Sequence, residues 1–364
     1  RLPGYGGAAP GNLAVGPLRN SGIIALTGAS VGNTLTVRGG LTSDCGRLIL
    51  NTVLGGDDSP TDRLILDSGR TTGSTALTVI NQGGQGAATQ RGILVVDAIN
   101  GASTAEDAFS LSSSSRNYRA GLGSLVAGAY DYSLLRGGHG GHEESWYLVS
   151  TFGGGGEPGA RPMARPETGM LLAGRDAAGR MFMDSLYDRL MSYKPLSENA
   201  EGGHVLGSVW GRMEGGRTRS YADHKNLKST ADSLVFNIGL DLGSWSGPSR
   251  GTLTTGLMFG LGRVEIDTES RADRNYQADG DIDGYSVGLY GTWFQHQDRR
   301  DGFYADAWVK RSWFDHSVKG WGLPEESFDS RLWSASLEGG YSATIFESDR
   351  AQWSFDPSFQ AIYK

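Results

Sequence analysis

The strongest constraint on this chain lies in its last third, where stretches of strand length alternate apolar and polar side chains. Leu253, Leu257 and Leu261 fall on one face of such a stretch, because side chains along a strand alternate with period two. The residues between them are mostly small or polar. The same alternation returns from Tyr285 to Trp293 and from Trp333 to Ile345. Each stretch therefore predicts a strand with one apolar and one polar face.

Two architectures contain strands of this kind. In a soluble β-sandwich the apolar faces meet in a core, and in a transmembrane β-barrel the apolar face contacts lipid. The stretches reach the roughly 9 to 11 residues that a tilted membrane strand needs. Charged residues such as Asp306 and Lys310 lie inside them on the polar face, and aromatic residues recur near their ends. These observations favour a transmembrane antiparallel β-barrel, and a soluble all-β protein stays as the alternative.

Composition excludes several other classes of protein. The chain has 364 residues, 57 of them glycine, and the glycines follow no three-residue period, which argues against a collagen-like fold. Its single cysteine, Cys45, excludes an intramolecular disulfide and a cysteine-based metal cluster. A formal net charge of -7 with no basic stripe argues against nucleic acid as a partner.

Residues 1–152 contain short apolar stretches separated by Gly, Asn, Asp and Ser. The stretches are Asn12–Val15, Asn33–Val37, Arg47–Leu54, Asp62–Asp67, Ala76–Asn81 and Gly92–Ile99. Their spacing, with no lasting helical period, predicts the rungs of a parallel β-helix, in which each rung buries the apolar face of the next. A soluble β-sandwich is the alternative for this part as well.

A glycine-rich hinge at Gly153–Gly156 separates this part from a helical one. Residues from Glu167 to about Tyr193 favour a helix that Pro195 ends, although Gly169 and Gly174 lead us to expect a shorter or kinked one. The segment is too charged to cross a bilayer. It is predicted either to lie on a surface or, since it directly precedes the barrel, to thread the barrel lumen.

Seven strand candidates follow. They are Val205–Glu214, Ser233–Trp245, Thr252–Ile266, Asp283–Phe294, Gly302–Trp313, Leu332–Phe346 and Gln352–Tyr363. Bacterial single-chain barrels have even strand numbers, so we expect an incomplete barrel in a fragment cut at both ends. The predicted domains are residues 1–152, the β-helix end; residues 153–202, the hinge and linker helix; and residues 203–364, the barrel.

Charged residues of the linker helix and of the polar strand faces are the candidate functional residues. We expect them to hold the helix in the pore by salt links: Asp184, Asp188, Arg189, Arg212, Glu214, Asp241, Asp306, Lys310 and Glu338.

No catalytic, cofactor or metal site is predicted. His139, His142, Glu143 and Glu144 lie in a glycine-rich loop that is typical of a solvated tip rather than a metal site. Asp57, Asp58 and Asp62 lack the EF-hand order and are predicted to form a β-turn. No Gly-Xaa-Ser-Xaa-Gly motif organises a serine nucleophile.

In order and spacing, the sequence resembles the type V secretion autotransporters, with a pertactin-like passenger end and an autotransporter β-domain. The resemblance is carried by Leu54–Asp57, Asp62–Leu66, Gly92–Val96, Trp146–Ser150, Arg165–Glu167, the pair Asp188–Arg189, and Trp210–Arg212. It implies a barrel of about twelve strands in the Gram-negative outer membrane. It also implies a linker helix in the pore and a right-handed passenger β-helix, whose rungs at residues 41–150 nucleate folding outside the cell.

The resemblance further implies partners and a function. The partners would be outer-membrane lipid, the barrel assembly machinery, periplasmic chaperones and a host-surface ligand. The chain would translocate and display its own passenger, an adhesin or virulence-type β-helix. The alternative is an upstream passenger that is an exported enzyme, such as a serine protease or esterase; no enzyme activity is expected of the present residues.

Overall fold

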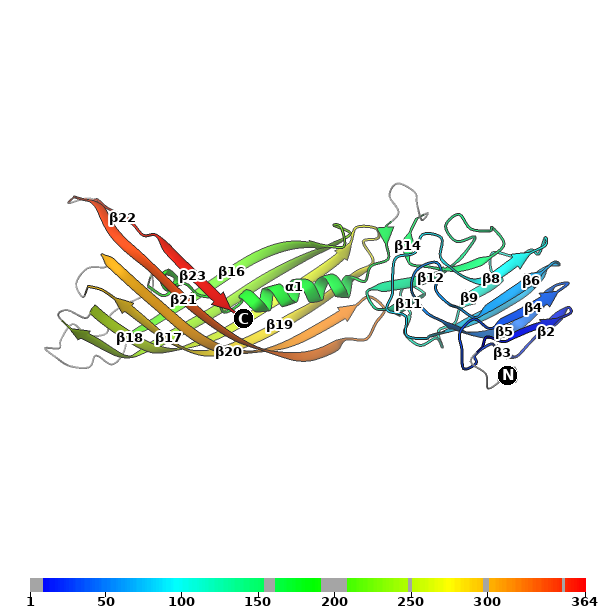
Figure 1. Ribbon diagram of the computed structural model, residues 1–364, viewed down its shortest axis with the longest axis horizontal. Coiled ribbons are helices and arrows are strands. Elements are labelled where there is room, and N and C mark those ends of the chain that lie inside the picture. Colours follow the sequence, from blue (N-terminus) through cyan, green and yellow to red (C-terminus); the bar gives the residue numbers. More distant parts are fainter. Residues whose placement is uncertain (1–8, 154–160, 191–207, 248–250, 297–300, 349–350) are drawn as a thin grey trace.

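The computed structural model describes residues 9–153, 161–190, 208–247, 251–296, 301–348 and 351–364. A stacked β-structure occupies one end of the molecule and a long curled sheet the other, with one main helix inside the curl (Figure 1). The predicted order of β-helix end, linker helix and antiparallel barrel sheet is therefore confirmed.

The N-terminal part is built from rungs that stack along one axis. Strands of successive rungs pair in parallel and form two sheets. The first pairs β1 (Asn12–Val15), β4 (Thr34–Arg38), β6 (Arg63–Asp67) and β8 (Ile93–Ile99). The second pairs β2 (Leu18–Asn20) and β3 (Ile23–Ala25) with β5 (Leu41–Thr52), then β7 (Thr71–Asn81) and β9 (Phe109–Leu111). All six predicted apolar stretches overlap these strands.

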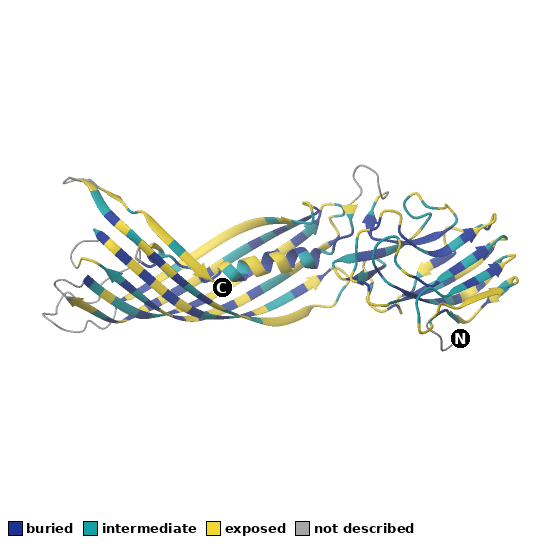
Figure 2. Cartoon of the chain, viewed as in Figure 1, coloured by how far each residue is buried: buried dark blue, intermediate teal, exposed yellow. Residues whose placement is uncertain are grey.

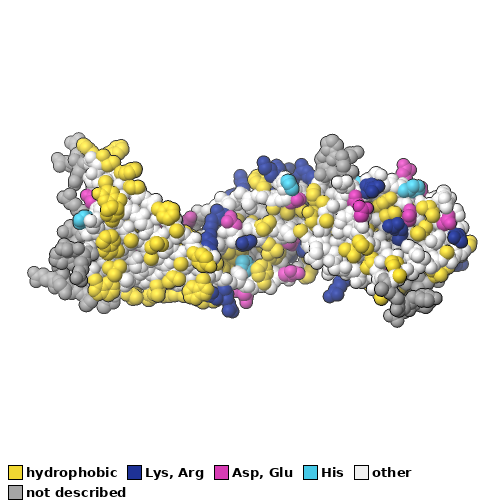
Figure 3. Space-filling model, viewed as in Figure 1, with side chains coloured by type: hydrophobic (Ala, Val, Ile, Leu, Met, Phe, Trp, Pro, Cys, Tyr) yellow, Lys and Arg dark blue, Asp and Glu magenta, His cyan; other side chains and the backbone are white. Residues whose placement is uncertain are grey.

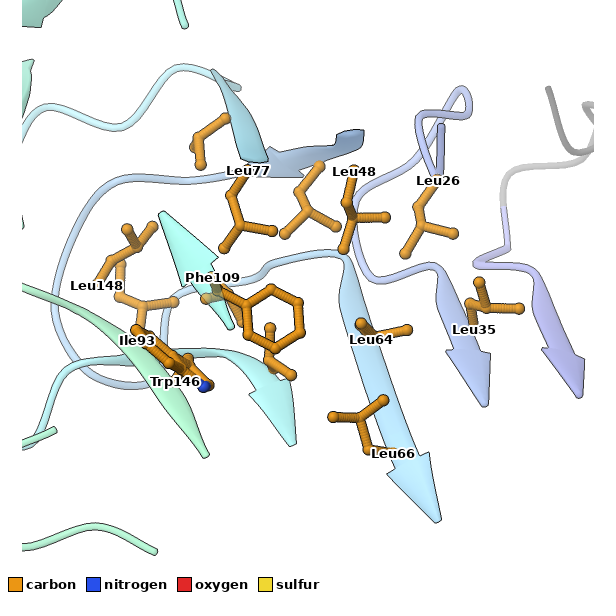
Figure 4. Close-up of a cluster of buried hydrophobic side chains, with 14 of the residues drawn as sticks. Leu26, Leu35, Leu48, Leu64, Leu66, Leu77, Ile93, Phe109, Trp146 and Leu148 are labelled. Carbon is orange, nitrogen blue, oxygen red and sulfur yellow. The ribbon is translucent and has the colours of Figure 1, made fainter. Parts of the chain in front are cut away.

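Leucine and valine ladders fill the space between the two sheets. Leu35 pairs with Leu64 and Leu64 with Val96, so that identical positions of successive rungs bury one another. Leu48 and Leu77 do the same in the second sheet, and Phe109 and Trp146 close the cluster (Figure 4). Burial of this apolar surface stabilises the stack by about 25 cal/mol per Å².

Antiparallel strands end the stack nearest the barrel. They are β10 (Tyr118–Arg119), β11 (Ser124–Ala127), β12 (Tyr130–Arg136) and β13 (Trp146–Val149), followed by the pair β14 (Thr151–Phe152) and β15 (Arg161–Pro162). Gly128, with a φ of 53°, permits the reversal between β11 and β12. Because β13 pairs antiparallel to β8, these hairpins cover an edge that would otherwise be open. The sequence analysis did not anticipate this change from parallel to antiparallel pairing.

The linker forms helix α1 (Pro166–Arg180) and a short second helix, α2 (Leu186–Leu190). Proline at the first position suits a helix start, since its missing N–H would have no partner there. The helix is shorter than predicted, but the glycines do not end it. A Cβ on Gly169 would lie 3.0 Å from Thr268 Cγ2, and one on Gly174 would lie 3.1 Å from Ile282 Cδ1. Both glycines therefore let α1 lie close against the sheet. Residues 191–193 of the predicted helix lie outside the described residues.

Long antiparallel strands form the C-terminal sheet. They are β16 (Val209–Ala222), β17 (Leu227–Gly247), β18 (Gly251–Ser270), β19 (Gln277–Phe294), β20 (Gly302–Gly320), β21 (Glu326–Ser348), β22 (Ala351–Phe355) and β23 (Ser358–Tyr363). The last predicted strand is divided: Asp356 and Pro357 separate β22 from β23, and both halves pair with β21. Residues 203–207, where the barrel was predicted to begin, lie outside the described part.

The strands are longer than their apolar patterns predicted. From β16 to β21 they contain 14, 21, 20, 18, 19 and 23 residues. On β18 the outward residues are apolar only as far as Leu261, which is 63% exposed, and Arg263 and Glu265 then take the outward positions. The outward apolar pattern thus covers about half of each strand, and the polar half extends toward the β-helix.

Burial alternates along most of β17 to β20, and α1 lies against the inward face of these four strands (Figure 2). Hydrophobic side chains gather on the part of the sheet farthest from the β-helix, and Lys and Arg side chains stand at the edge of that region (Figure 3). We call this region the apolar band; it includes Leu240, Leu253, Phe259, Leu261, Leu289, Phe303, Val309, Trp333, Leu337 and Ile345.

The sheet curls around α1 without closing. Among the strands that the structure describes, β16 and the β22–β23 pair are the two edges, and no hydrogen-bonded pairing joins them. Within the described residues, no helix has both the length and the apolar character needed to cross a membrane.

Candidate functional site

The carboxylate of Asp184, between α1 and α2, is the centre of a buried cluster inside the curled sheet. Its Oδ2 forms an ion pair with Nζ of Lys310 on β20, and its Oδ1 accepts hydrogen bonds from Arg212 on β16 at 3.0 Å and Asn237 on β17 at 3.2 Å. Lys310 Nζ also donates to the Phe182 carbonyl at 2.6 Å. Because Asp184 and Lys310 are almost completely buried, each needs the other to compensate its charge.

Arg212 extends this cluster to α2. Its NH1 lies 3.4 Å from Asp188 Oδ2, and its NH2 pairs with Glu214. Asp188 also accepts the Ser185 N–H at 2.8 Å, which caps the short helix. Glu214 is largely solvent-exposed, so it marks the wet side of the cluster.

Arg189 of α2 reaches the opposite side of the sheet interior. It forms a buried ion pair with Asp306, and its guanidinium lies 4.6 Å from the centre of the Tyr290 ring. Thr292 Oγ1 donates to Asp306 at 2.6 Å, and the Tyr290 hydroxyl donates to Asp241. Among the described residues, Tyr290 thus connects Asp241 to Arg189 of the linker.

The backbone of the linker is held as well. Glu338 Oε2 accepts the Leu186 N–H at 2.9 Å, and the Asp184 carbonyl accepts from Trp308 Nε1 and Gln360 Nε2, both at 3.0 Å. These bonds provide partners for backbone groups at the start of α2, which the short helix does not satisfy by itself.

All the predicted pore residues thus belong to one connected group, which we call the pore cluster. Tyr290, Trp308, Asn237 and Gln360 complete it and were not among the predicted site residues. The two-residue alternation along the strands could have identified them: Trp308, for example, lies on the same inward face of β20 as Asp306 and Lys310. Apolar contacts of α1 and of the two residues after it continue the attachment, since Met170, Met181 and Phe182 belong to one buried cluster with Ile266, Ile282 and Phe314.

A second buried cluster joins the β-helix to the barrel, and we call it the junction cluster. Its centre is Arg119 on β10, whose side chain has no exposed surface. Arg119 Nε lies 3.2 Å from Asp131 Oδ1 on β12, and its NH2 lies 2.9 Å from Glu167 Oε1 on α1. Two loops at the same end of the sheet complete the cluster: the Tyr276 hydroxyl donates to Asp131, and Arg119 NH1 donates to the Trp321 carbonyl at 2.8 Å.

Glycines allow this close approach. A Cβ on Gly320 would lie 1.7 Å from Glu167 Oε1, and a Cβ on Gly322 would lie 2.4 Å from the Gly121 backbone nitrogen. The loop after β20 therefore packs directly on the start of α1 and on the β-helix. The sequence analysis missed this cluster, because its members come from five separate segments.

Burial sets the protonation of the junction cluster. It raises the pKa of the Asp131 carboxyl above its ordinary value, against the opposing effect of Arg119. Burial also raises the pKa of the Tyr276 hydroxyl, so this group stays protonated and donates a hydrogen bond to Asp131.

The other polar groups that the sequence singled out have local structural contacts. Asp62 is buried and accepts the backbone N–H groups of Gly32, Asn33 and Asn51 at 2.8 to 3.0 Å. Asp57 accepts three backbone N–H groups between Gln90 and Gly92, and Asp58 is exposed. Both bonded carboxylates staple neighbouring turns of the β-helix.

The glycine-rich loop is tied down in the same way. Glu144 pairs with Arg136 at 2.7 Å, and one ring nitrogen of His139 lies 3.1 Å from the Thr151 carbonyl, whereas His142 and Glu143 are exposed. Cys45 is exposed too. In the described ranges, no group of three or more His, Cys, Asp or Glu residues has the arrangement to hold a metal ion.

Two family models match the chain. The autochaperone domain type 1 matches residues 15–134, and the autotransporter beta-domain matches residues 209–364. The first match covers most of the β-helix and part of its antiparallel end, and the second covers the curled sheet.

Relatives agree with these matches. YdeU of Escherichia coli K12 is 34% identical over 86% of this chain and 67% of its own length. The autotransporter adhesin AIDA-I of Escherichia coli is 32% identical over 93% of this chain, and the adhesin BmaC autotransporter of Brucella suis is 29% identical over 94%. The chain spans 25% of the length of AIDA-I and 10% of that of BmaC.

Among solved structures, the crystal structure of the transport unit of AIDA-I is similar, with a TM-score of 0.48 and 29% identity over 54% of this chain and 61% of that one. The two family models and the relatives show that the chain belongs to the autotransporter family, with its β-domain in the outer membrane and its passenger exposed at the cell surface.

Proposed function

We propose that these residues are the transport and anchoring unit of a surface-displayed adhesin. In this proposal the barrel passes the passenger through the outer membrane, and the chain then keeps the passenger attached to the surface of the bacterium. The observation that carries the proposal is the path of the linker, which runs from the buried Glu167 at the β-helix to the buried Asp184 deep in the curled sheet.

The pore cluster supports retention of the linker. A helix held only by apolar contacts could slide along the lumen, whereas Asp184 and Arg189 each have a fixed partner, Lys310 and Asp306. Moving the linker would leave these buried charges without compensation, which typically costs about 3 to 5 kcal/mol for each broken pair. We propose that this cluster stops the linker at one position after transport.

The β-helix supports a role in driving transport. Each rung covers the apolar face of the one before, so folding can begin at the barrel end and proceed outward. The antiparallel strands β10–β13 supply a completed edge on which the first rung can form. Folding outside the cell would then oppose return of the chain through the pore.

An adhesin passenger is proposed because AIDA-I and BmaC are both named adhesins. Binding to a host surface and a role in virulence are part of this proposal. We propose no catalytic activity for the present residues. An exported serine protease or esterase would need its catalytic groups upstream, and such an activity in the full-length passenger is the alternative.

We also propose that the barrel assembly machinery and periplasmic chaperones handle this chain before insertion. The support is physical: long strands with unpaired edges aggregate readily unless they are protected, and the apolar band exposes large side chains such as Phe303 and Leu337.

The test uses the full-length protein in a Gram-negative host. Intact cells are treated with protease, and the outer-membrane fraction is compared by electrophoresis with and without boiling. We expect the protease to remove the passenger and to leave the barrel intact. The barrel band should shift on boiling. Cells that express the protein should adhere to epithelial cells. A protected passenger or an unshifted band would contradict transport and display. Display without adhesion but with hydrolysis of a peptide or ester substrate would favour the enzyme alternative.

A further inference from the structure

The outward face of β20 and β21 carries a compact group of two arginines and aromatic rings at the edge of the apolar band. Arg311 is directly opposite Trp333, and Trp313 is directly opposite Arg331. The guanidinium of Arg311 lies over both tryptophan rings: its Cζ is 5.0 Å from the Trp333 ring centre and 5.9 Å from that of Trp313. Tyr285 of β19 extends the stack, with its ring 5.4 Å from that of Trp313.

This arrangement fixes Arg311 in one orientation. A guanidinium over aromatic faces gains cation–π attraction, which favours one position of the side chain. The guanidinium supplies a planar fork of donors on the outward face of β20. Such a preorganised fork suits bidentate binding of a phosphate oxygen pair.

Arg311 and Arg331 differ from Arg263, another outward arginine of the sheet, in the carboxylates that lie close to them. In the described part of the chain, no carboxylate lies within ion-pair distance of the guanidinium of Arg311 or Arg331. Arg263, in contrast, faces outward on β18 and lies within 3.9 Å of each of three carboxylates, those of Glu265, Asp281 and Asp283. The positive charge of Arg311 and Arg331 is therefore available to an external anion.

The position along the strands indicates where that anion lies. On the membrane side of Arg311 the outward residues Val309, Ala307 and Phe303 are apolar. On the other side, Asp315 and Asp329 form an opposed pair one outward position beyond Trp313 and Arg331, which is a step of about 7 Å along a strand. The arginines thus lie where lipid gives way to water, the layer that holds lipid headgroups.

We infer that Arg311 and Arg331, framed by Trp313 and Trp333, bind the phosphate group of an anionic outer-leaflet lipid. The two arginines are diagonal neighbours on adjacent strands, a separation of about 7 to 8 Å between their Cα atoms, so both can reach one phosphate. Asp315 and Asp329 keep that phosphate from moving farther toward the water. The site depends on the outer-membrane location of the barrel, and not on what the passenger binds.

The test measures lipid binding by the folded chain in neutral detergent. Bisphosphorylated lipid A and the same lipid without its phosphates are added separately, and bound lipid is followed by native mass spectrometry. We expect the wild type to retain the phosphorylated form preferentially. Arg311→Gln should weaken that binding about tenfold, as expected for loss of one charge-assisted contact, and Arg331→Gln should weaken it to a similar extent.

Arg263→Gln is the matched control, since it also removes an outward arginine from the same sheet, and it should leave binding unchanged. Heat-modifiability on electrophoresis identifies variants whose barrel has not folded. If Arg311→Gln does not fold, Arg331→Gln takes its place in the test. Equal retention of both lipids, equal weakening by Arg263→Gln, or displacement of the lipid by inorganic phosphate at the same concentration would overturn the inference.

Discussion

Arg119 and Glu167 form a buried ion pair in which Arg119 NH2 lies 2.9 Å from Glu167 Oε1. Arg119 belongs to the β-helix and Glu167 to the first turn of the pore helix. The same guanidinium also binds Asp131 and the carbonyl of Trp321 in a barrel loop. The β-helix, the linker and the barrel therefore share one charged residue, and the junction cluster is complete only when all three have folded.

Replacing Arg119 should destabilise the junction strongly. Arg119→Met leaves Asp131 and Glu167 buried without their cation, which we expect to lower the free energy of unfolding of the β-helix by about 3 to 5 kcal/mol. The measurement is urea unfolding of the refolded chain in detergent, followed by protease resistance of the β-helix.

Arg165→Gln is the control for this change, because Arg165 also pairs with Glu167 but is partly exposed. Its effect should be clearly smaller. Equal urea midpoints for the two variants would show that Arg119 has no special role.

Asp184 and Lys310 should be energetically coupled. A double-mutant cycle with Asp184→Asn and Lys310→Met is expected to give a coupling energy of about 0.5 to 3 kcal/mol, because each single change leaves a buried charge behind. The readout is the urea midpoint for loss of the heat-modifiable band. The partly exposed pair Lys228 and Glu269 provides the control cycle, with an expected coupling below about 1 kcal/mol. Additive effects at Asp184 and Lys310 would contradict a pore cluster that holds the linker.

Gly320 should not tolerate a side chain. In Gly320→Ala the new Cβ would lie 1.7 Å from Glu167 Oε1, so the carboxylate must move away from Arg119. We expect a loss of about 1 to 3 kcal/mol in the stability of the junction, measured as for Arg119. In Gly291→Ala, the control in the same sheet, the nearest atom is Thr255 Cγ2 at 3.8 Å, and stability should stay within about 0.5 kcal/mol. A silent Gly320→Ala variant would show that the loop after β20 can shift.

Glu144 should make the β-helix sensitive to acid. The Thr104 N–H and Arg136 lower the pKa of the Glu144 carboxyl below its ordinary value. Since the folded state favours the ionised form, this contribution is fully present above the ordinary glutamate pKa and is lost as the pH falls through the lowered value. Glu144→Gln should therefore reduce stability at pH 7 and flatten its decline between pH 5 and pH 3. Urea midpoints across that range test this expectation, and parallel curves for the wild type and the variant would contradict it.

The face of a strand on which a residue lies could be predicted from the sequence. Leu253, Leu257 and Leu261 show a lipid-facing strand through period two, and Leu35 and Leu64 show successive rungs. The inward parity of Asp306 and Lys310 was enough to predict that they face the linker. In each case the physical cause is local: backbone geometry fixes which side chains share a face.

The tertiary structure alone decided which charges meet. Arg119, Glu167, Tyr276 and Trp321 come from distant segments, and no local period relates them, so their cluster depends on how the β-helix end docks on the barrel loops. The strand ends were also undetermined, because beyond Leu261 and Tyr285 the outward faces become charged while the hydrogen-bonded ladder continues. Periodicity in the sequence indicates whether a strand face meets water or an apolar environment. Which side chains pair, and where two segments pack closely, as Gly320 does against Glu167, is decided only in the folded molecule.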